Sequence, residues 1–389
     1  MTESMSPPKV YFTDMRCKPG DSLPSKLDRL VRAAGLESMD LDRRFVAIKM
    51  HFGELGNLAF LRPNYVRVIS DVVKEKGGIP FLTDCNTLYA GSRRNAVDHL
   101  DCAGLNGFNP MTTGCQIIIG DGLKGTDDVE IPIDGELVQT AKIGRAIADC
   151  DVLITLTHFK GHATTGMGGT IKNIAMGCAS RRGKKELHID GIPEVDGEKC
   201  VGCGRCVGAC GEGAIEVSEG KAEIDEDACV GCRRCIGACP VRALCSVKDR
   251  DGRLVDGKMV EYAAAVVRSK PCFHVSIICD VSPFCDCAAW NDVPIVPNVG
   301  MLASFDPVAV DRACVDMVQK QPMIPGSRLF ENACGIKPDD VIGCNQPGTR
   351  WQNHFEHAVK MGMGDGSYEL VEVRRSLPAV LLASMRGSV

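Results

Sequence analysis

Residues 200–210 read CVGCGRCVGAC and residues 229–239 read CVGCRRCIGAC, with Pro240 directly after the second stretch. Each stretch holds four cysteines with the spacing C-x₂-C-x₂-C-x₃-C. Such close spacing lets one loop present three thiolates to a metal centre, while the fourth cysteine begins the next helix and reaches a different centre. Small neighbours such as Gly202 and Gly231 let backbone N–H groups approach the sulfurs. The two stretches therefore decide the local fold, because such a segment is organised by its metal centres.

The repeated spacing predicts two [4Fe–4S] clusters of the kind that bacterial ferredoxins hold. In two-cluster ferredoxins the fourth cysteine of each run binds the cluster of the other run. We therefore predict that cluster one is bound by Cys200, Cys203, Cys206 and Cys239, and cluster two by Cys229, Cys232, Cys235 and Cys210. Zinc also accepts four cysteines, so a pair of zinc sites is the alternative. Two runs with the same spacing in one short segment favour the clusters.

The segment around the cysteines resembles the dicluster ferredoxin family over its whole length, residues 191–248. The similarity includes Ala214-Ile215 after the first run and Ile224-Asp225 before the second. One departure is Gly211, which stands where the family usually has proline. The resemblance implies a small α+β domain that transfers electrons.

The rest of the chain has the pattern of an α/β fold. Short β-branched runs alternate with amphipathic stretches, which predicts a largely parallel sheet covered by helices. We expect strands at 10–14, 45–51, 79–83, 116–119, 151–157, 273–280, 294–299 and 368–373, and helices at 23–34, 64–76, 143–148, 258–268, 307–319 and 351–361. This pattern stops near residue 191 and resumes near residue 248. The sequence therefore predicts an α/β domain of residues 1–190 and 249–389, interrupted by an inserted domain of residues 191–248.

The composition favours a globular cytoplasmic protein. The chain has 389 residues, 44% of them hydrophobic, and a net charge of −5. No apolar run reaches the roughly 18 residues of a membrane span, and the N-terminus lacks the residue order of a signal peptide. No basic tract with interleaved aromatics is present, so we expect neither nucleic acid nor membrane as a partner. In a reducing cytoplasm the 22 cysteines indicate metal binding, catalysis or buried small side chains.

Polar residues concentrate just after three expected strands. Ligands of parallel sheets collect at this edge, so these residues should form one site. Several cations buried together need an anion or a metal to offset their repulsion, which predicts a small anionic ligand or an additional metal. We predict that the ligand is bound by Lys160, Lys172, Arg93, Gly168 and Gly169, and that protons are moved by His158, His162 or His51. The alternatives are glycines that serve only a tight turn, and histidines that bind metal or are structural.

Two cysteines one residue apart, Cys285 and Cys287, follow the strand expected at 273–280 and the breaker Ser282-Pro283. In a loop, two such thiols can share a metal or form a redox pair. The simplest alternative is that both are buried and inert.

Outside the insert, the chain resembles the DUF362 family of proteins of unknown function, many of which carry a ferredoxin insert. The similarity runs from about residue 10 to about residue 373 and includes residues 83–89, 158–162, 168–173, 285–287 and 304–311. Asn298 and Cys85 replace an Asp and a Thr that relatives often carry, which weakens both as candidates for chemistry. A fainter likeness links the Gly-Gly and Lys run after residue 158 to lactate racemase with its nickel-pincer cofactor, and none of that enzyme's residues is carried over.

These observations support two functions. The first is an iron–sulfur oxidoreductase in which the insert passes electrons to a ligand or cofactor bound by the α/β domain. The second is a non-catalytic electron-transfer or cluster-handling protein that docks on a redox partner. The partner is then either a redox protein or a small-molecule substrate. The acidic residues of the insert would suit a basic redox protein, and they are Glu212, Glu216, Glu219, Glu223, Asp225, Glu226 and Asp227.

Overall fold

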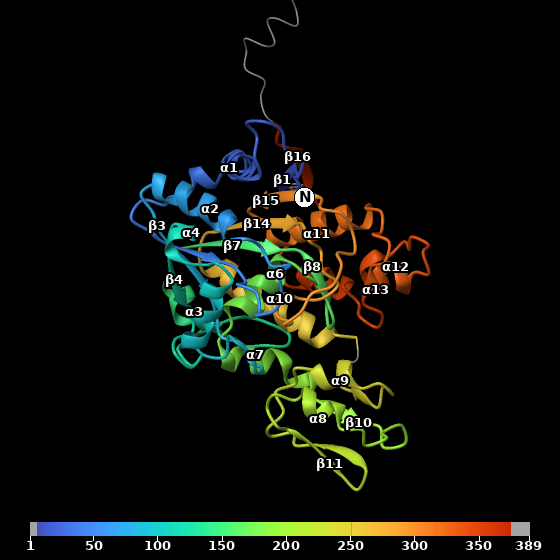
Figure 1. The fold of residues 1–389 in the computed structure, drawn as a ribbon. Coiled ribbons are helices and arrows are strands. Elements are labelled where there is room, and N and C mark those ends of the chain that lie inside the picture. Colours follow the sequence, from blue (N-terminus) through green and yellow to red (C-terminus); the bar gives the residue numbers. More distant parts are fainter. Residues whose placement is uncertain (1–5, 250, 375–389) are drawn as a thin grey trace, which may run out of the picture.

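A computed structural model describes residues 6–249 and 251–374 of the chain. Its largest feature is an eight-stranded sheet with the order β16-β1-β15-β14-β7-β2-β3-β4 (Figure 1). The strands are β1 (Lys9–Asp14), β2 (Phe45–Lys49), β3 (Ile79–Asp84), β4 (Gln116–Ile119), β7 (Val152–His158), β14 (Cys272–Ile278), β15 (Gly300–Ser304) and β16 (Glu369–Glu372). Only β15 runs antiparallel to its neighbours in this sheet. The predicted largely parallel sheet is confirmed.

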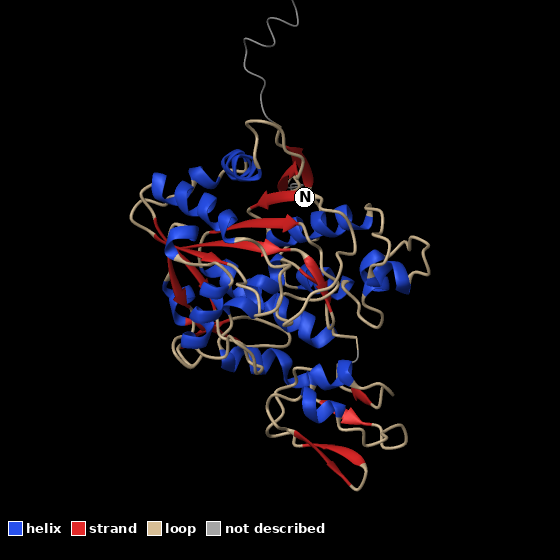
Figure 2. Ribbon diagram, in the orientation of Figure 1, coloured by secondary structure: helices blue, strands red, loops and turns tan. Residues whose placement is uncertain are grey.

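Helices cover both faces of this sheet (Figure 2). On one face α1 (Leu23–Ala33) and α2 (Pro63–Glu75) pack in a hydrophobic cluster that includes Ile154 of β7. On the other face α6 (Thr170–Cys178), α10 (Arg253–Ser269) and α11 (Pro307–Gln319) pack in a second cluster that includes Leu153. Successive side chains of a strand point to opposite faces, so a strand buried on both sides must be apolar throughout.

Shorter elements surround this frame. The helices are α3 (Ala96–Leu105), α4 (Pro110–Thr113), α5 (Arg145–Asp149), α7 (Arg181–His188), α12 (Arg328–Asn332), α13 (Val341–Asn345) and α14 (Gln352–Lys360), with 3₁₀ turns η1 (Leu36–Ser38) and η2 (Ile189–Gly191). Two hairpins are formed by β5 (Asp128–Pro132) with β6 (Thr140–Gly144), and by β8 (Lys160–His162) with β9 (Gly166–Gly168). In the described ranges 6–249 and 251–374, no helix is both long and apolar enough to cross a membrane.

Two expected elements are wrong. Residues 294–299 form no strand, because Pro294 and Pro297 lack the N–H groups that a central ladder needs, and β15 begins only at residue 300. The helix expected at 143–148 is shorter, because residues 143–144 pair with β5 as part of β6 and α5 begins at Arg145. Residues 1–5, 250 and 375–389 of the predicted α/β domain lie outside the described residues.

Residues 193–246 form a lobe at one end of the molecule, called here the cysteine-rich lobe (Figure 1). Its elements are β10 (Pro193–Val195), α8 (Arg205–Ala209), β11 (Ile215–Ser218), β12 (Lys221–Ile224), α9 (Arg234–Ala238) and β13 (Leu244–Ser246). It has a hydrophobic cluster of its own, in which Cys200, Cys206 and Cys235 are buried. The chain enters and leaves side by side, since Pro193 pairs with Ser246. That residues 191–248 are an independent inserted domain stays a prediction.

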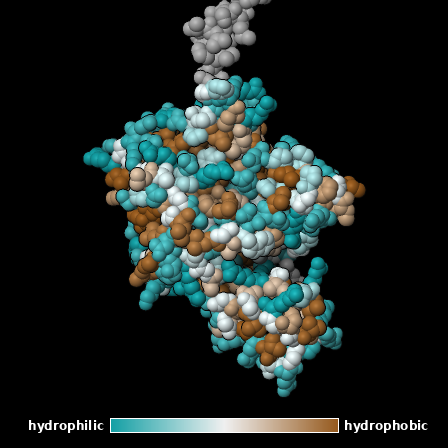
Figure 3. Space-filling model, viewed as in Figure 1, coloured by the Kyte–Doolittle hydropathy of each residue, from teal (hydrophilic) through white to brown (hydrophobic). Residues whose placement is uncertain are grey.

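The surface of the lobe mixes hydrophilic and hydrophobic side chains (Figure 3). Its exposed apolar side chains include Val201, Val207, Val217 and Val241. The lobe is tied to the α/β domain by charged contacts, with Arg233 donating to Asp249 at 2.7 Å and Arg94 to Glu212 at 2.6 Å. These ties fix which side of the lobe faces the sheet.

Candidate functional site

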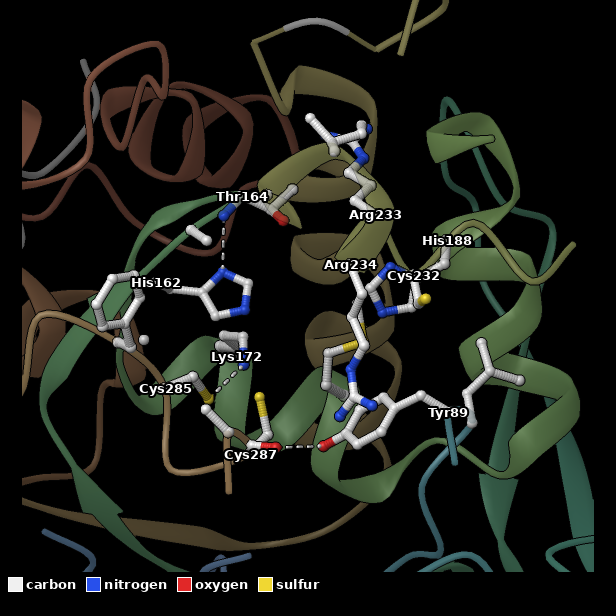
Figure 4. Close-up of a pocket in the computed structure, with 18 of the residues that line it drawn as sticks. Tyr89, His162, Thr164, Lys172, His188, Cys232, Arg233, Arg234, Cys285 and Cys287 are labelled. Atoms are coloured by element: carbon white, nitrogen blue, oxygen red, sulfur yellow. Dashed lines mark hydrogen bonds between the residues drawn. The ribbon is translucent and has the colours of Figure 1, made fainter. Parts of the chain in front are cut away.

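A cavity of about 1430 Å³ lies between the carboxyl edge of the sheet and the cysteine-rich lobe (Figure 4). Segments that follow β2, β3, β7 and β14 line it from the α/β side, and α9 lines it from the lobe. Parallel strands end at one edge of a sheet, so segments distant in sequence meet here. The predicted site residues that line the cavity are His51, Arg93, Lys160, His162, Gly168, Gly169, Lys172, Cys285 and Cys287. Cys232, a predicted ligand of cluster two, lines it as well.

Most of the cations at this cavity already face a carboxylate. Arg93 is buried with its Nε 3.2 Å from Glu54 and its Nη1 3.7 Å from Asp84. Lys49 lies 3.1 Å from the same Asp84. Burial opposes ionisation of Asp84, but Lys49 and its other positive neighbours outweigh it and hold the pKa of that carboxyl below its usual value. These groups form a neutralised buried network, so they contribute little free charge to the cavity.

Lys172 on α6 differs from these cations. In the part of the chain that the structure describes, no carboxylate oxygen is within 4 Å of its Nζ, and its recorded partner is the Cys285 sulfur at 3.5 Å. Burial alone would lower the pKa of Lys172, but its neighbouring cysteine sulfurs, Cys285 first, raise it overall. Lys172 therefore stays charged and is the best placed side chain to bind an anion (Figure 4).

Lys160 lies between these two cases. Its Nζ donates to the His158 carbonyl at 2.9 Å and lies 3.3 Å from Asp286. It lines the cavity, but its charge is shared with the Asp286 carboxylate. We conclude that Lys160 has two roles. It holds the loop that contains Asp286, and it faces the cavity.

His158, a predicted proton-transfer residue, lies behind the wall of the cavity. His158 does not line the cavity, since it is buried with Nδ1 2.9 Å from the Asp286 carboxylate and Nε2 2.7 Å from the Cys279 carbonyl oxygen. Both ring nitrogens face hydrogen-bond acceptors. His158 therefore has a structural role, because it links the Asp286 side chain to the Cys279 backbone.

His51 and His162 are better placed as hydrogen-bond donors. Nδ1 of His51 accepts the Gly53 N–H at 3.0 Å, and Nδ1 of His162 accepts the N–H groups of Thr164 and Thr165 at 3.3 and 3.2 Å. Burial lowers the pKa of both rings well below the usual value, and nearby cations add to the effect. Each ring is therefore neutral near pH 7, and its proton is on Nε2, available to a ligand.

Gly168 and Gly169, which were predicted to bind the anion, precede α6 but leave no free N-terminus there for a ligand. The first-turn N–H groups of Thr170 and Ile171 donate to the Asp311 carboxylate at 2.6 and 2.9 Å. A side chain at Gly169 would place its Cβ 2.5 Å from an Asp311 oxygen, so glycine is required there for this close approach. Gly168 and Gly169 still line the cavity, but the carboxylate of Asp311 on α11 takes the place predicted for the anion.

Several cavity residues come from regions that sequence reasoning did not assign to the site. Arg234 on α9 stacks with its guanidinium carbon 4.3 Å from the centre of the Tyr89 ring and donates to the Ala90 carbonyl at 3.0 Å. Arg233 and His188 also line the cavity, and burial together with Arg233 lowers the pKa of His188 to about 3. The one available signal was the Arg-Arg pair inside the second cysteine run, where the first run has Gly-Arg.

The lobe brings the cysteines together in two sets. A small apolar cavity in it is lined by Cys200, Cys203, Cys206 and Cys239. In the other set, burial raises the pKa of Cys229, Cys232 and Cys235, and the negative charge of nearby Cys210 raises each further. Thus the last cysteine of each run lies with the first three of the other.

Backbone N–H groups point at sulfurs of both sets. Ala222 donates to Cys200 at 3.4 Å, and Ala243 donates to Cys239 at 3.2 Å. Cys210 in the other set accepts from Ala214 at 3.3 Å. Within residues 6–249 and 251–374, no three or more His, Cys, Asp or Glu side chains are grouped so that they could hold a metal ion. What the two sets provide is grouped cysteine sulfurs with N–H donors beside them, the ligand type that iron–sulfur clusters use.

Comparisons with known proteins give one family and several distant likenesses. The thylakoid-associated protein sll1697 of Synechocystis sp. is 27% identical over 135 residues, which are 35% of this chain and 38% of that protein. The chain thus spans well under half the length of this curated relative. The lactate racemase apoprotein of Thermoanaerobacterium thermosaccharolyticum has a TM-score of 0.36 and 14% identity, over 65% of this chain and 49% of that one. A crystal structure of a Thermotoga maritima protein has a TM-score of 0.35 and 8% identity, over the same shares.

The family match covers the strand ends that build the cavity. Residues 46–316 match the domain of unknown function DUF362. The matched range begins in β2 and ends within α11, so it includes the lobe and the Cys285-Asp286-Cys287 loop. Since this range is more than half of the 389 residues, the chain belongs to the DUF362 family.

Proposed function

We propose that this protein is an oxidoreductase in which two [4Fe–4S] clusters in the cysteine-rich lobe exchange electrons with an anionic ligand bound at the sheet edge. One observation carries the proposal. The same cavity is lined by Cys232, a predicted ligand of cluster two, and by Lys172, a cation that faces no carboxylate in the described residues (Figure 4). A ligand held at Lys172 would therefore share this cavity with one cluster.

The two cysteine sets support the cofactor part of the proposal. Cys200, Cys203, Cys206 and Cys239 would hold cluster one, and Cys229, Cys232, Cys235 and Cys210 would hold cluster two. When bound, each cluster accepts or donates one electron. The N–H donors at Cys200, Cys210 and Cys239 would favour the more negative, reduced state by partly neutralising charge on the sulfurs.

The residues of the α/β domain would bind and orient the ligand. Lys172 supplies the positive charge, and the Nε2–H groups of His51 and His162 supply neutral donors. Arg234, stacked on Tyr89, would close the cavity from the lobe side. Neutral imidazoles can donate a proton to a developing negative charge, so either histidine can supply a proton when electrons arrive. A further metal at Cys285 and Cys287 is not part of this function.

The second candidate function is electron transfer without catalysis, and the position of the first cysteine set favours it. Cys203 is exposed, and neighbouring Val201 is 65% exposed at the surface of the lobe. A redox partner protein could therefore approach this set directly. The large cavity at the other set favours the oxidoreductase, for which a protein docking at Cys203 would be the electron donor or acceptor.

We propose a cytoplasmic location, where 22 cysteines stay reduced, and neither nucleic acid nor membrane as a partner.

Replacing Lys172 with alanine is expected to weaken binding of an anionic probe, inorganic phosphate, by about tenfold or more. The loss corresponds to a charge-assisted hydrogen bond of about 1.5–3 kcal/mol. Isothermal titration calorimetry on anaerobic protein measures it, and the visible iron–sulfur absorbance should not change. The matched control is Lys199→Ala, because Lys199 also lines the cavity but is exposed and paired with Asp196 at 2.6 Å. Equal binding by wild type and Lys172→Ala would contradict the assignment of the anion site.

A further inference from the structure

The loop after β14 presents two thiols to the cavity. Cys285 and Cys287 belong to one tight turn, in which the Ala288 N–H donates to the Cys285 carbonyl at 3.0 Å. The turn places the two side chains on the same wall of the cavity, and each thiol influences the pKa of the other. Both cysteines line the cavity that Cys232 lines from the lobe (Figure 4). Since only Asp286 separates the two cysteines, a disulfide between them would form when their side chains turn toward each other.

Contacts from three other segments fix the backbone of this turn. Asp286, between the two cysteines, is buried and held by His158 at 2.9 Å and Lys160 at 3.3 Å. The Asp286 carbonyl accepts the Glu54 N–H at 3.0 Å, and the Cys287 carbonyl accepts the Tyr89 hydroxyl at 3.4 Å. The two sulfurs take no part in these contacts. They face the cavity, and the Cys285 sulfur accepts a hydrogen bond from Lys172. This explains the buried His158–Asp286 pair, which positions the thiols.

The charges around the pair make one sulfur a nucleophile. The neighbouring thiol of Cys287, with help from Lys172 and Lys160, lowers the pKa of Cys285 well below the usual value despite its burial. Cys287 keeps the shared proton, so its pKa is raised. Cys85, which lines the same cavity without such partners, has its pKa raised by burial. A thiolate beside a thiol is the reactive form of a dithiol redox pair.

We propose that Cys285 and Cys287 are a redox-active dithiol that reduces a small, negatively charged disulfide bound at Lys172 and is itself reduced by the two clusters. This inference rests on the proposed function, which supplies the electrons. The charge on Lys172 selects an anion, and the thiol pair selects a disulfide. This role of Cys285 and Cys287 does not require a third metal.

The steps balance in atoms and electrons. The Cys285 thiolate attacks one sulfur of the substrate disulfide, and the other substrate sulfur leaves as a thiolate. Cys287 then loses its proton and attacks the Cys285 sulfur, which releases the second substrate thiolate and leaves a Cys285–Cys287 disulfide. The proton passes to a released thiolate. Reopening this disulfide to the Cys285 thiolate and the Cys287 thiol takes two electrons and one proton, and the two clusters would supply one electron each.

The first experiment follows the disulfide itself in anaerobic holoprotein. After diamide oxidation, peptide mass spectrometry is expected to find a Cys285–Cys287 disulfide, which reduced methyl viologen reopens. In Cys232→Ala protein, shown by iron analysis to lack cluster two, the same disulfide should form but reopen at least tenfold more slowly with the viologen, while dithiothreitol reopens it in both. Thiols at 285 and 287 that stay unpaired after oxidation, or that retain a bound metal ion, would overturn the dithiol. Formation of the disulfide in protein without iron or sulfide would instead count against the proposed function alone.

The second experiment measures turnover with an anionic disulfide, dithiobis(nitrobenzoate), and reduced methyl viologen as the electron donor. Cys285→Ser should lower turnover at least a hundredfold, and Cys287→Ser should stop after one event with a mixed disulfide on Cys285. The control is Cys334→Ser, which removes an exposed thiol outside the cavity and should leave turnover unchanged. The cationic disulfide cystamine should react at least tenfold more slowly than the anionic one. Unchanged turnover in Cys285→Ser would overturn the proposal.

Discussion

Replacing Cys239 with alanine is expected to remove cluster one, although Cys239 belongs to the second cysteine run. In the lobe Cys239 lines one small cavity with Cys200, Cys203 and Cys206, and Cys210 lies with the second run instead. Iron and sulfide in anaerobic protein should therefore each fall from about eight to about four per chain. Electron paramagnetic resonance of the reduced variant should show one isolated cluster.

The double variant Cys203→Ala with Cys239→Ala distinguishes the two possible assignments. If both cysteines bind one cluster, the double variant keeps about four iron atoms and has the spectrum of each single variant. If Cys239 binds the cluster of its own run, the double variant loses both clusters. Cys245→Ala is the control, because Cys245 is an exposed thiol of the same lobe outside the cysteine sets.

Removing residues 191–248 and joining the ends with a short Gly/Ser linker is expected to leave a folded, colourless α/β domain. The ends of the segment are adjacent, since Pro193 pairs with Ser246 and the Ser246 hydroxyl donates to the Asp190 carbonyl at 3.1 Å. The two hydrophobic clusters on the faces of the sheet contain no residue of the lobe. All iron is lost, while near-UV circular dichroism and cooperative urea unfolding should persist.

The deletion also leaves one buried carboxylate without its partner. Asp249 is 2% exposed and bound to Arg233 of the lobe, so its loss of that partner should destabilise the truncated domain by about 3–5 kcal/mol. A second deletion variant with Asp249→Asn controls for this effect. If both variants are molten by near-UV circular dichroism, the lobe is part of the main fold and the prediction of an inserted domain is wrong.

The sequence was sufficient for the features that depend on local spacing and on sheet geometry. Apolar runs predicted the parallel strands, because strands covered on both faces carry no polar alternation. The direction of parallel strands then predicted that His51, Arg93 and Lys172 would meet, and they line one cavity. The strand expected at 294–299 is absent, because Pro294 and Pro297 cannot donate the hydrogen bonds of a ladder.

The features that sequence reasoning missed depend on contacts between distant residues. His158 is paired with Asp286, which is 128 positions away, and Asp311 caps α6 from 141 positions beyond Thr170. Neither partner follows a local pattern that identifies its target. The contact of Arg234 on α9 with Tyr89 could not be predicted either, because it depends on how the lobe packs against the α/β domain.

We propose that the lobe carries two iron–sulfur clusters that serve a ligand site at the edge of the sheet. The most direct test is metal and acid-labile sulfide analysis of protein purified without oxygen, together with electron paramagnetic resonance after one-electron reduction. We predict about eight iron and eight sulfide per chain and the signals of two magnetically interacting [4Fe–4S] clusters. Zinc bound by the cysteines, with no sulfide, would contradict the assignment of two iron–sulfur clusters to the lobe.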